Sequence, residues 1–171
     1  EKLRYDLATV KIPVSKLGTA TEMEMVDILL TWAQDDGKRH MEAFGYDGDF
    51  AAEIEGKLSD NGREVLKFLS GDYSVEHGWL NPYYRERHGV NLPSHNNYAP
   101  LSVKPGQAGD GKMYDPVTGM EITGNTLTPS SLRTRSRSAT AAPDFKDALQ
   151  KWLAHKRQLN FWVAYFDYAQ D

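Results

Sequence analysis

Hydrophobic residues recur every three or four positions early in the chain, which is the spacing of an amphipathic helix. These positions are Met25, Ile28, Leu29 and Trp32. Just before them, Thr21 and Glu24 have the spacing of a capping box, in which each side chain accepts a hydrogen bond from the other residue's backbone amide. We predict a helix over residues 21–35 that ends near Gly37.

Two short helices and one long helix follow in the pattern. Met41 and Phe44 indicate a short helix ended by Gly45, and Phe50–Leu58 forms another. A broad apolar stripe then predicts a long helix over residues 60–88, capped by Ser59 or Asp60 and stopped by Gly89. Its apolar positions are Val65, Leu66, Leu69, Tyr73, Leu80 and Tyr84. Because Pro82 removes a helical hydrogen bond, we expect a kink or break near residues 78–82.

The last part of the chain holds a seven-residue repeat over three heptads, which predicts a long helix. The repeat consists of Phe145, Leu149, Trp152, Lys156, Leu159, Val163 and Phe166. Pro143 suits the first turn of this helix. We expect it to pack on the 60–88 helix and to bury Trp152, Leu159, Val163 and Phe166.

Extended structure is predicted at the N-terminus and between the two long helices. Residues 4–17 alternate in character and read as a strand or a loose hairpin ended by Gly18. Residues 89–142 form a long loop excursion, with an edge strand at Tyr98–Lys104, a hairpin at Lys112–Ile122 and a mobile part at 128–142. The expected fold is therefore mainly α with minor β, a single helical domain over residues 1–171.

One element of the excursion invites a specific hypothesis. Pro100 biases Ala99 to an extended conformation, so that Tyr98 can return to the core while Asn97 hydrogen bonds to backbone. We expect this element to pin the start of the loop to the helical body near Tyr83–His88.

Composition narrows the class of protein. The chain has 171 residues, 40% hydrophobic and 26% charged, which suits one globular domain, and it has no cysteine for disulfides or thiolate metal sites. No apolar run approaches a membrane span, and no signal peptide is visible. Since the chain opens without Met and its last helix has no stop signal, we expect a piece of a longer protein.

Charge is unevenly distributed along the chain. Residues 1–76 hold nine basic and sixteen acidic residues, a balance of −7, whereas residues 128–157 hold seven basic and two acidic, a balance of +5. Such asymmetry can steer a partner, or it can reflect two solvated faces of opposite sign.

The sequence offers few candidate metal-binding or catalytic residues. His77 and His88 are about three helical turns apart, so they cannot share a metal on one helix, and His88 and His95 have no carboxylate at ligand spacing. His40 and His155 are expected at helix surfaces, and acid pairs such as Glu53 and Glu55 on a solvated face. Residues 106–111 are glycine-rich but open no helix, and the sequence holds no Gly-x-Ser-x-Gly elbow, phosphate loop, His-Glu-x-x-His or Gly-x-Gly-x-x-Gly motif. We assign no catalytic, cofactor-binding or metal-binding residue.

Aromatic and basic residues give candidate contacts to nucleic acid or to a protein partner. The arginines of residues 133–137 alternate with Ser and Thr in a manner that suits phosphate, although the whole chain is acidic. The candidate residues are Arg133, Arg135, Arg137, Tyr83, Tyr84, Arg85, Arg87, His88 and Tyr98.

Several short motifs, in order, resemble a region of very large phage and prophage proteins, the polyvalent and internal virion proteins. They are the Glu22–Gly37 helix, Gly45–Asp47, Tyr84–Gly89, Asn97–Leu101, Ser131–Arg135, Asp147–Leu149, His155 and Ala164–Tyr165. Ala99 stands where that family has an aromatic residue. The resemblance implies a helical, non-catalytic segment between other modules of a long protein that is packaged or ejected with DNA.

Two functional interpretations follow. The first is a non-catalytic structural or interaction domain of a phage protein, in the virion or the host bacterial cytoplasm. Its partners would be other modules of the parent protein, a second copy through the C-terminal helix, or DNA, and it would need no cofactor. The alternative is a nucleic-acid-binding or enzymatic module with a site around Tyr83–Tyr98 and Arg133–Arg137.

Overall fold

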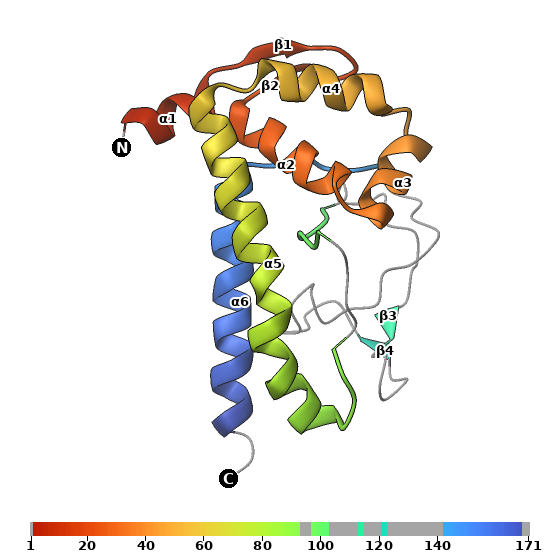
Figure 1. Ribbon diagram of the computed structural model, residues 1–171, viewed down its shortest axis with the longest axis vertical. Helices are drawn as coiled ribbons and strands as arrows, with labels where there is room; N and C mark the ends of the chain where they lie inside the picture. The colour runs from red at the N-terminus through yellow and green to blue at the C-terminus, as the bar shows by residue number, and fades with distance from the viewer. Residues whose placement is uncertain (1, 93–96, 103–112, 115–120, 123–141, 169–171) are drawn as a thin grey trace.

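The structure is a computed structural model that describes residues 2–92, 97–102, 113–114, 121–122 and 142–168. It confirms a mainly helical fold with minor β (Figure 1). The elements are α1 (Lys2–Thr9), β1 (Ile12–Val14), β2 (Gly18–Ala20), α2 (Glu22–Trp32), α3 (Asp35–Ala43), α4 (Gly48–Lys57), α5 (Asp60–His88), β3 (Met113–Tyr114), β4 (Glu121–Ile122) and α6 (Ala148–Tyr168).

The N-terminus begins with a helix, so the prediction of a strand or hairpin from residue 4 was wrong there. Within α1, the Thr9 hydroxyl donates a hydrogen bond of 2.7 Å to the Tyr5 carbonyl one turn earlier. Leu7 is buried in the core while Tyr5 is exposed. A short antiparallel hairpin does follow, with Ile12 opposite Ala20. The first strand therefore begins at Ile12, several residues later than the alternating pattern predicted.

The hairpin is fixed to α4 through a carboxylate that we had placed on a solvated face. Glu53 accepts a hydrogen bond of 3.0 Å from the Ser15 amide and one of 2.7 Å from Lys57 Nζ. These hydrogen bonds lower the pKa of Glu53 from its ordinary 4.5 to about 2. Glu53 is thus a joint between the β1–β2 turn and α4.

Helix α2 is the centre of the main core. The predicted capping box is present, with Glu24 N donating to Thr21 Oγ1 at 3.2 Å and Thr21 N donating to Glu24 Oε2 at 2.7 Å. Met23, Met25 and Ile28 are fully buried against the surrounding helices. Gly37 does not end α2; it lies inside α3, where a Cβ would collide with the backbone of Thr31.

Helix α5 has the predicted bounds. The Ser59 hydroxyl caps it by accepting from Gly62 N, and Gly89 ends it with a left-handed φ of 69°. The helix runs through Pro82 without the predicted break (Figure 1). The carbonyl that the proline ring crowds belongs to Gly78, whose backbone adjusts most easily.

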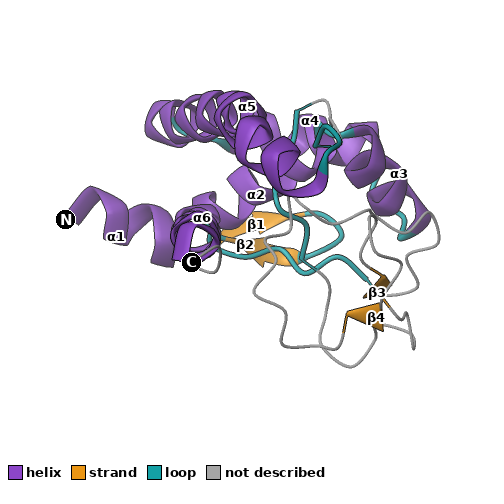
Figure 2. Cartoon of the chain, turned by 90° about the horizontal axis from the view of Figure 1, so that it is seen from below, coloured by secondary structure: helices purple, strands orange, loops and turns teal. Residues whose placement is uncertain are grey.

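Helix α6 lies beside α5 and runs in the same direction, as Figures 1 and 2 show. Leu159 and Trp162 pack with Leu80, Tyr84 and Leu92 in a second core cluster. Leu159 is fully buried as predicted, but Trp152 and Val163 are half-buried, and the side chain of Phe166 lies outside the description.

The buried face of α6 is turned relative to the predicted heptad. Over residues 148–164, where its side chains are described, the buried residues are Ala148, His155, Leu159 and Trp162. Pro143 is not in the first turn, because residues 143–147 are bound elsewhere: Asp144 N donates to Ser102 O at 2.9 Å. Asp147 precedes the helix instead and accepts from Gln150 N at 3.0 Å.

The chain that follows α5 turns back, and Leu92 hydrogen bonds to side chains of α5. Leu92 O lies 2.9 Å from His77 Nε2, and Leu92 N donates to Asn81 Oδ1 at 2.7 Å. The predicted hairpin is present as β3–β4, paired antiparallel with Met113 opposite Ile122. Residues 98–102 form no strand, and the segment predicted to be mobile lies outside the described residues apart from residue 142.

Tyr98 returns to the core, but not where we expected it. Its ring lies 6.1 Å from the Tyr73 ring and 5.8 Å from the His155 ring, between the middle parts of α5 and α6. Asn97 Nδ2 donates to Ala33 O, 3.0 Å away, just after α2. The element therefore attaches to α2 and the α5–α6 pair, well before the Tyr83–His88 end of α5.

Candidate functional site

A charged pair joins α2 to the start of α6. Lys151 Nζ lies 2.7 Å and 3.0 Å from the two carboxylate oxygens of Asp27, and Lys146 N donates to Asp27 Oδ2 at 3.0 Å. The side chains are only 3% exposed for Asp27 and 9% for Lys151. All three hydrogen bonds to this buried carboxylate therefore come from the far end of the chain.

A second buried pair joins α5 to α6. His155 Nε2 lies 2.8 Å and 3.0 Å from the oxygens of Glu76, and both side chains are 2% exposed. An ionised carboxylate can only accept, so His155 Nε2 carries the proton and donates it. Lys156 Nζ adds a contact of 3.3 Å to Glu76.

A further charged contact between α5 and α6 lies one helical turn closer to the start of α5. Asp72 Oδ2 is 2.6 Å from Lys156 Nζ and accepts a 2.8 Å hydrogen bond from Trp152 Nε1. Three acidic residues on α2 and α5 thus meet three basic residues on α6. We call the set Asp27, Asp72, Glu76, Lys151, His155 and Lys156 the charged cluster.

Burial and pairing act against each other in this cluster. Burial raises the pKa of Asp27 above its ordinary 3.8, although the charge and hydrogen bonds of Lys151 oppose the shift. Burial also acts to raise the pKa of Asp72, but hydrogen bonds from Lys156 and Trp152 outweigh it and the pKa is lowered. Burial raises the pKa of Tyr73, which stacks near His155.

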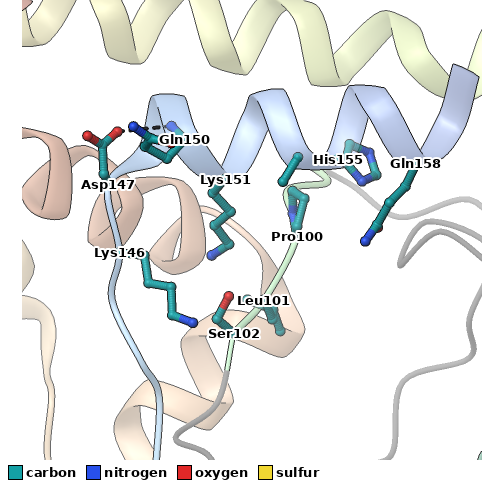
Figure 3. Close-up of a pocket in the computed structure, with 10 residues that line it drawn as sticks. Pro100, Leu101, Ser102, Lys146, Asp147, Gln150, Lys151, His155 and Gln158 are labelled. Atoms are coloured by element: carbon teal, nitrogen blue, oxygen red, sulfur yellow. Dashed lines mark hydrogen bonds between the residues drawn. The ribbon is translucent and has the colours of Figure 1, made fainter. Parts of the chain in front are cut away.

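A groove of about 490 Å³ lies beside the cluster, between α6 and residues 100–102. Figure 3 shows Lys146 and Lys151 reaching into this space, with His155 and Gln158 further along α6. Lys151 is engaged with Asp27 and Lys146 with Asp144, 3.2 Å away. The groove offers ammonium, amide and hydroxyl groups that can hydrogen bond a polar or extended ligand.

The geometry of the charged cluster does not suit a metal ion. Within the described residues, no group of three or more His, Asp or Glu side chains has an arrangement that could hold a metal ion. His155 and Glu76 form an acid–base pair with Lys156 beside it, and a cation there would meet an ammonium group.

The structure separates the candidate contact residues. Tyr83, Arg85 and Arg87 are exposed near the end of α5, and Arg87 lies over the Trp162 ring at 5.9 Å. Tyr84 is buried and its ring is 4.4 Å from that of His88, so it belongs to the core. Tyr98 lies far from this group against Tyr73. Arg133, Arg135 and Arg137 lie outside the described residues.

The sequence analysis missed the charged cluster. His155 was expected at a helix surface, yet it is 3% exposed, and no role was predicted for Asp27, which is 2% exposed. One signal was present: Asp27 lies among Met25, Val26 and Ile28 in a nearly all-apolar run, where a carboxylate needs a partner. The identity of that partner could not be read from the sequence.

Comparison with known proteins gives no relative: no protein-family model, curated protein or solved structure matches this chain. Among the residues that the structure describes, no helix is long and apolar enough to cross a membrane.

Proposed function

We propose that this chain is a non-catalytic structural and interaction domain of a large phage-encoded protein, either polyvalent or internal to the virion. The charged cluster carries the non-catalytic part of the proposal. Each of its carboxylates accepts hydrogen bonds from a basic residue on another helix. A general acid or base must instead be positioned toward a substrate proton.

The cluster also explains how one domain is made from distant parts of the chain. Asp27 and Lys151 are 124 positions apart, and Glu76 and His155 are 79 apart. These pairs close the fold around the excursion and leave both its ends beside the helical body. This arrangement suits a segment that presents a long insertion or lies between other modules.

The phage context rests on the motifs of the resemblance, and several motif residues have structural roles in this fold. Gly89 ends α5 in the left-handed conformation, and Asn97 hydrogen bonds the backbone after α2. His155 pairs with Glu76 in the core. The motif residues therefore include contacts that hold the helices of this fold together.

The proposed partners are other modules of the parent protein or a second copy, in the virion or the host bacterial cytoplasm. Self-association through the heptad face of α6 is not favoured, because Leu159 and Trp162 pack inside the molecule. The partner surface is better sought on α5, where Phe68 and Val75 are exposed.

The test uses the natural reading frame that contains this segment. We expect it to encode further modules, and we expect peptides of this chain in purified particles or in freshly infected cells by mass spectrometry. A reading frame that ends at this domain, with peptides in neither fraction, would refute the phage assignment. Turnover of a substrate that is lost on His155→Gln in a variant of unchanged stability would refute the non-catalytic part.

Nucleic-acid binding is a second candidate because Tyr83, Arg85 and Arg87 are all exposed at the end of α5. An aromatic ring beside arginines suits stacking and phosphate contacts on a single strand. Fluorescence anisotropy with a labelled oligonucleotide should then show affinity that falls with salt and with Tyr83→Ala. If neither added salt nor the Tyr83→Ala replacement lowers the affinity, this surface does not bind nucleic acid.

A further inference from the structure

The buried apolar residues of the described structure form two separate clusters. The larger cluster, centred on α2, has sixteen buried residues and includes Leu69 and Tyr73 from α5 and Ala148 from α6. The smaller cluster has five buried residues, with Val163 packed against them: Leu80, Tyr84, Leu92, Leu159 and Trp162. Each long helix therefore contributes its first part to one cluster and its later part to the other.

A buried polar layer separates the two clusters along both helices. On α5 this layer is Glu76, about one turn after Tyr73 and one turn before Leu80. On α6 it is His155, about one turn before Leu159. The Glu76 and His155 side chains are both 2% exposed and pair with each other, so the layer crosses the interior of the molecule.

The hydrogen bonds of this layer come from the charged cluster. His155 Nε2 lies 2.8 Å from Glu76, and Lys156 Nζ lies 3.3 Å from Glu76 and 2.6 Å from Asp72. The Tyr73 ring, which belongs to the larger cluster, lies 5.8 Å from the His155 ring. These hydrogen bonds therefore do not depend on the smaller cluster.

Beyond the polar layer, the two long helices project from the rest of the fold. Figure 1 shows the later parts of α5 and α6 extending away from α2, α3 and α4. We call residues 77–92 and 157–168 the distal arm, and residues 2–76, 97–102 and 142–156 the body. All members of the smaller cluster lie in the distal arm.

Further contacts join the parts of the distal arm to each other. Leu92 O lies 2.9 Å from His77 Nε2, and Leu92 N donates to Asn81 Oδ1 at 2.7 Å. Across the helix pair, Arg87 lies 5.9 Å from the Trp162 ring. Because both partners of each contact lie in the arm, these contacts form and break together with the smaller cluster.

We propose that the distal arm opens as one cooperative unit while the body stays folded. Residues that share a close-packed core depend on one another, because each fills space beside its neighbours. Leu80 and Leu159 share one core, whereas the α2 residues Met25 and Ile28 belong to the other. The polar layer is the boundary, since its hydrogen bonds remain within the body when the arm opens.

The sizes of the two clusters determine which part opens. Within the described residues, the larger cluster has sixteen buried members and the smaller one five. Burial of apolar surface is the main stabilising contribution, so the arm opens at a lower free energy than the body unfolds. The fold thus contains a segment that can rearrange on a stable support, and this inference does not depend on the phage assignment.

The sequence of α5 favours the same boundary. Gly78 and Pro82 both lie beyond the polar layer. Proline has no amide hydrogen to donate to the Gly78 carbonyl, and both residue types have low helix propensity. The part of α5 in the distal arm therefore depends on the smaller cluster for its helical structure.

The first test is native-state hydrogen exchange of the full chain over a series of low urea concentrations. Amides of residues 79–88 and 158–164 should share one opening free energy that is lower than that of the α2 amides. This free energy should also fall less steeply with urea, because opening of the arm exposes less surface than global unfolding. Arm amides that match the α2 amides in both respects would overturn the inference, and so would rates that only rise gradually toward the helix ends.

Two leucines of α5 provide a matched pair of variants. Leu69 and Leu80 are both fully buried, the first in the body and the second in the distal arm. Leu69→Ala should speed exchange of the body amides roughly 30-fold or more and leave the arm amides unchanged, because the body is folded whether the arm is closed or open. Leu80→Ala should speed exchange of the arm amides on both helices by one common factor. It should also speed the body amides, since global unfolding starts from the same destabilised closed state.

The pattern of acceleration decides between one cooperative unit and two. If Leu69→Ala speeds the arm amides as much as the body amides, the chain unfolds as one unit and the inference is wrong. If Leu80→Ala leaves the amides of residues 158–164 at the wild-type rate, the two helices of the arm open separately and the inference is equally wrong. Should either alanine variant fail to fold, valine at the same position gives the same comparison with a smaller factor.

Discussion

The Asp27–Lys151 pair gives the most direct test of how α6 is held. The Asp27 side chain is 3% exposed, so replacing Lys151 by Met leaves a buried carboxylate without its counter-ion. At a separation of 2.7 Å and an effective dielectric constant of about 20, the pair's Coulomb energy is about 6 kcal/mol. Desolvation offsets part of this energy, so we expect either single replacement to cost about 3–5 kcal/mol.

The double variant separates a buried pair from general damage. Asp27→Leu with Lys151→Met removes both charges and leaves an apolar contact of similar size, which in other buried pairs is neutral or stabilising. Here the Lys146 amide also loses its acceptor, which costs about 1 kcal/mol. We therefore expect the double variant to be within about 1 kcal/mol of wild type, and far more stable than either single variant.

The assay is urea unfolding followed by circular dichroism, with the midpoint and slope fitted for all four proteins. A single replacement should also lower Tm by roughly 10 °C. Arg39→Ala is the control, because that exposed pair with Asp36 should contribute less than about 1 kcal/mol. Additive losses below about 1 kcal/mol at Asp27 and Lys151 would show that α6 does not bury this pair against α2.

Four further outcomes are expected. The pKa of Glu53 falls from 4.5 to about 2 on folding. The ionised Glu53 carboxylate therefore stabilises the folded state fully above pH 4.5, and this stabilisation is lost as the pH falls through about 2. Glu53→Gln should reduce the change in unfolding free energy with pH between these values. Trp152→Ala should cost about 3 kcal/mol in urea, whereas Trp152→Phe should cost about 1 kcal/mol, since it loses mainly a hydrogen bond. Tyr98→Ala should lower Tm through lost packing on Tyr73 and leave partner affinity unchanged; normal melting with lost binding would place it in a binding surface. Gly37→Ala should lower the free energy of unfolding by about 1–3 kcal/mol, because the backbone of Thr31 occupies the space of the added carbon. Gly56→Ala is the control and should be neutral or stabilising, because that position is open. Equal effects of the two replacements would contradict the close packing at residue 37.

The sequence alone located the start of α2 and both ends of α5, because each depends on groups within a few residues. Thr21 and Glu24 form the predicted capping box, and Ser59 begins α5. Gly89 ends α5 because the left-handed conformation suits glycine. The mainly α class, the β3–β4 hairpin and the pairing of the two long helices followed from the same local patterns. The phage context remains a hypothesis from short motifs.

Tertiary structure decided where the local pattern was ambiguous and where charges met. Residues 2–9 form a helix that packs Leu7 into the core, although the alternating pattern of this region suggested a strand. The buried face of α6 is centred on His155, because Glu76 supplies a buried carboxylate 79 positions away. Asp27 likewise required Lys151, at a separation of 124. A buried charge reveals in sequence only that it needs a partner, and the packing of distant helices determines which residue that partner is.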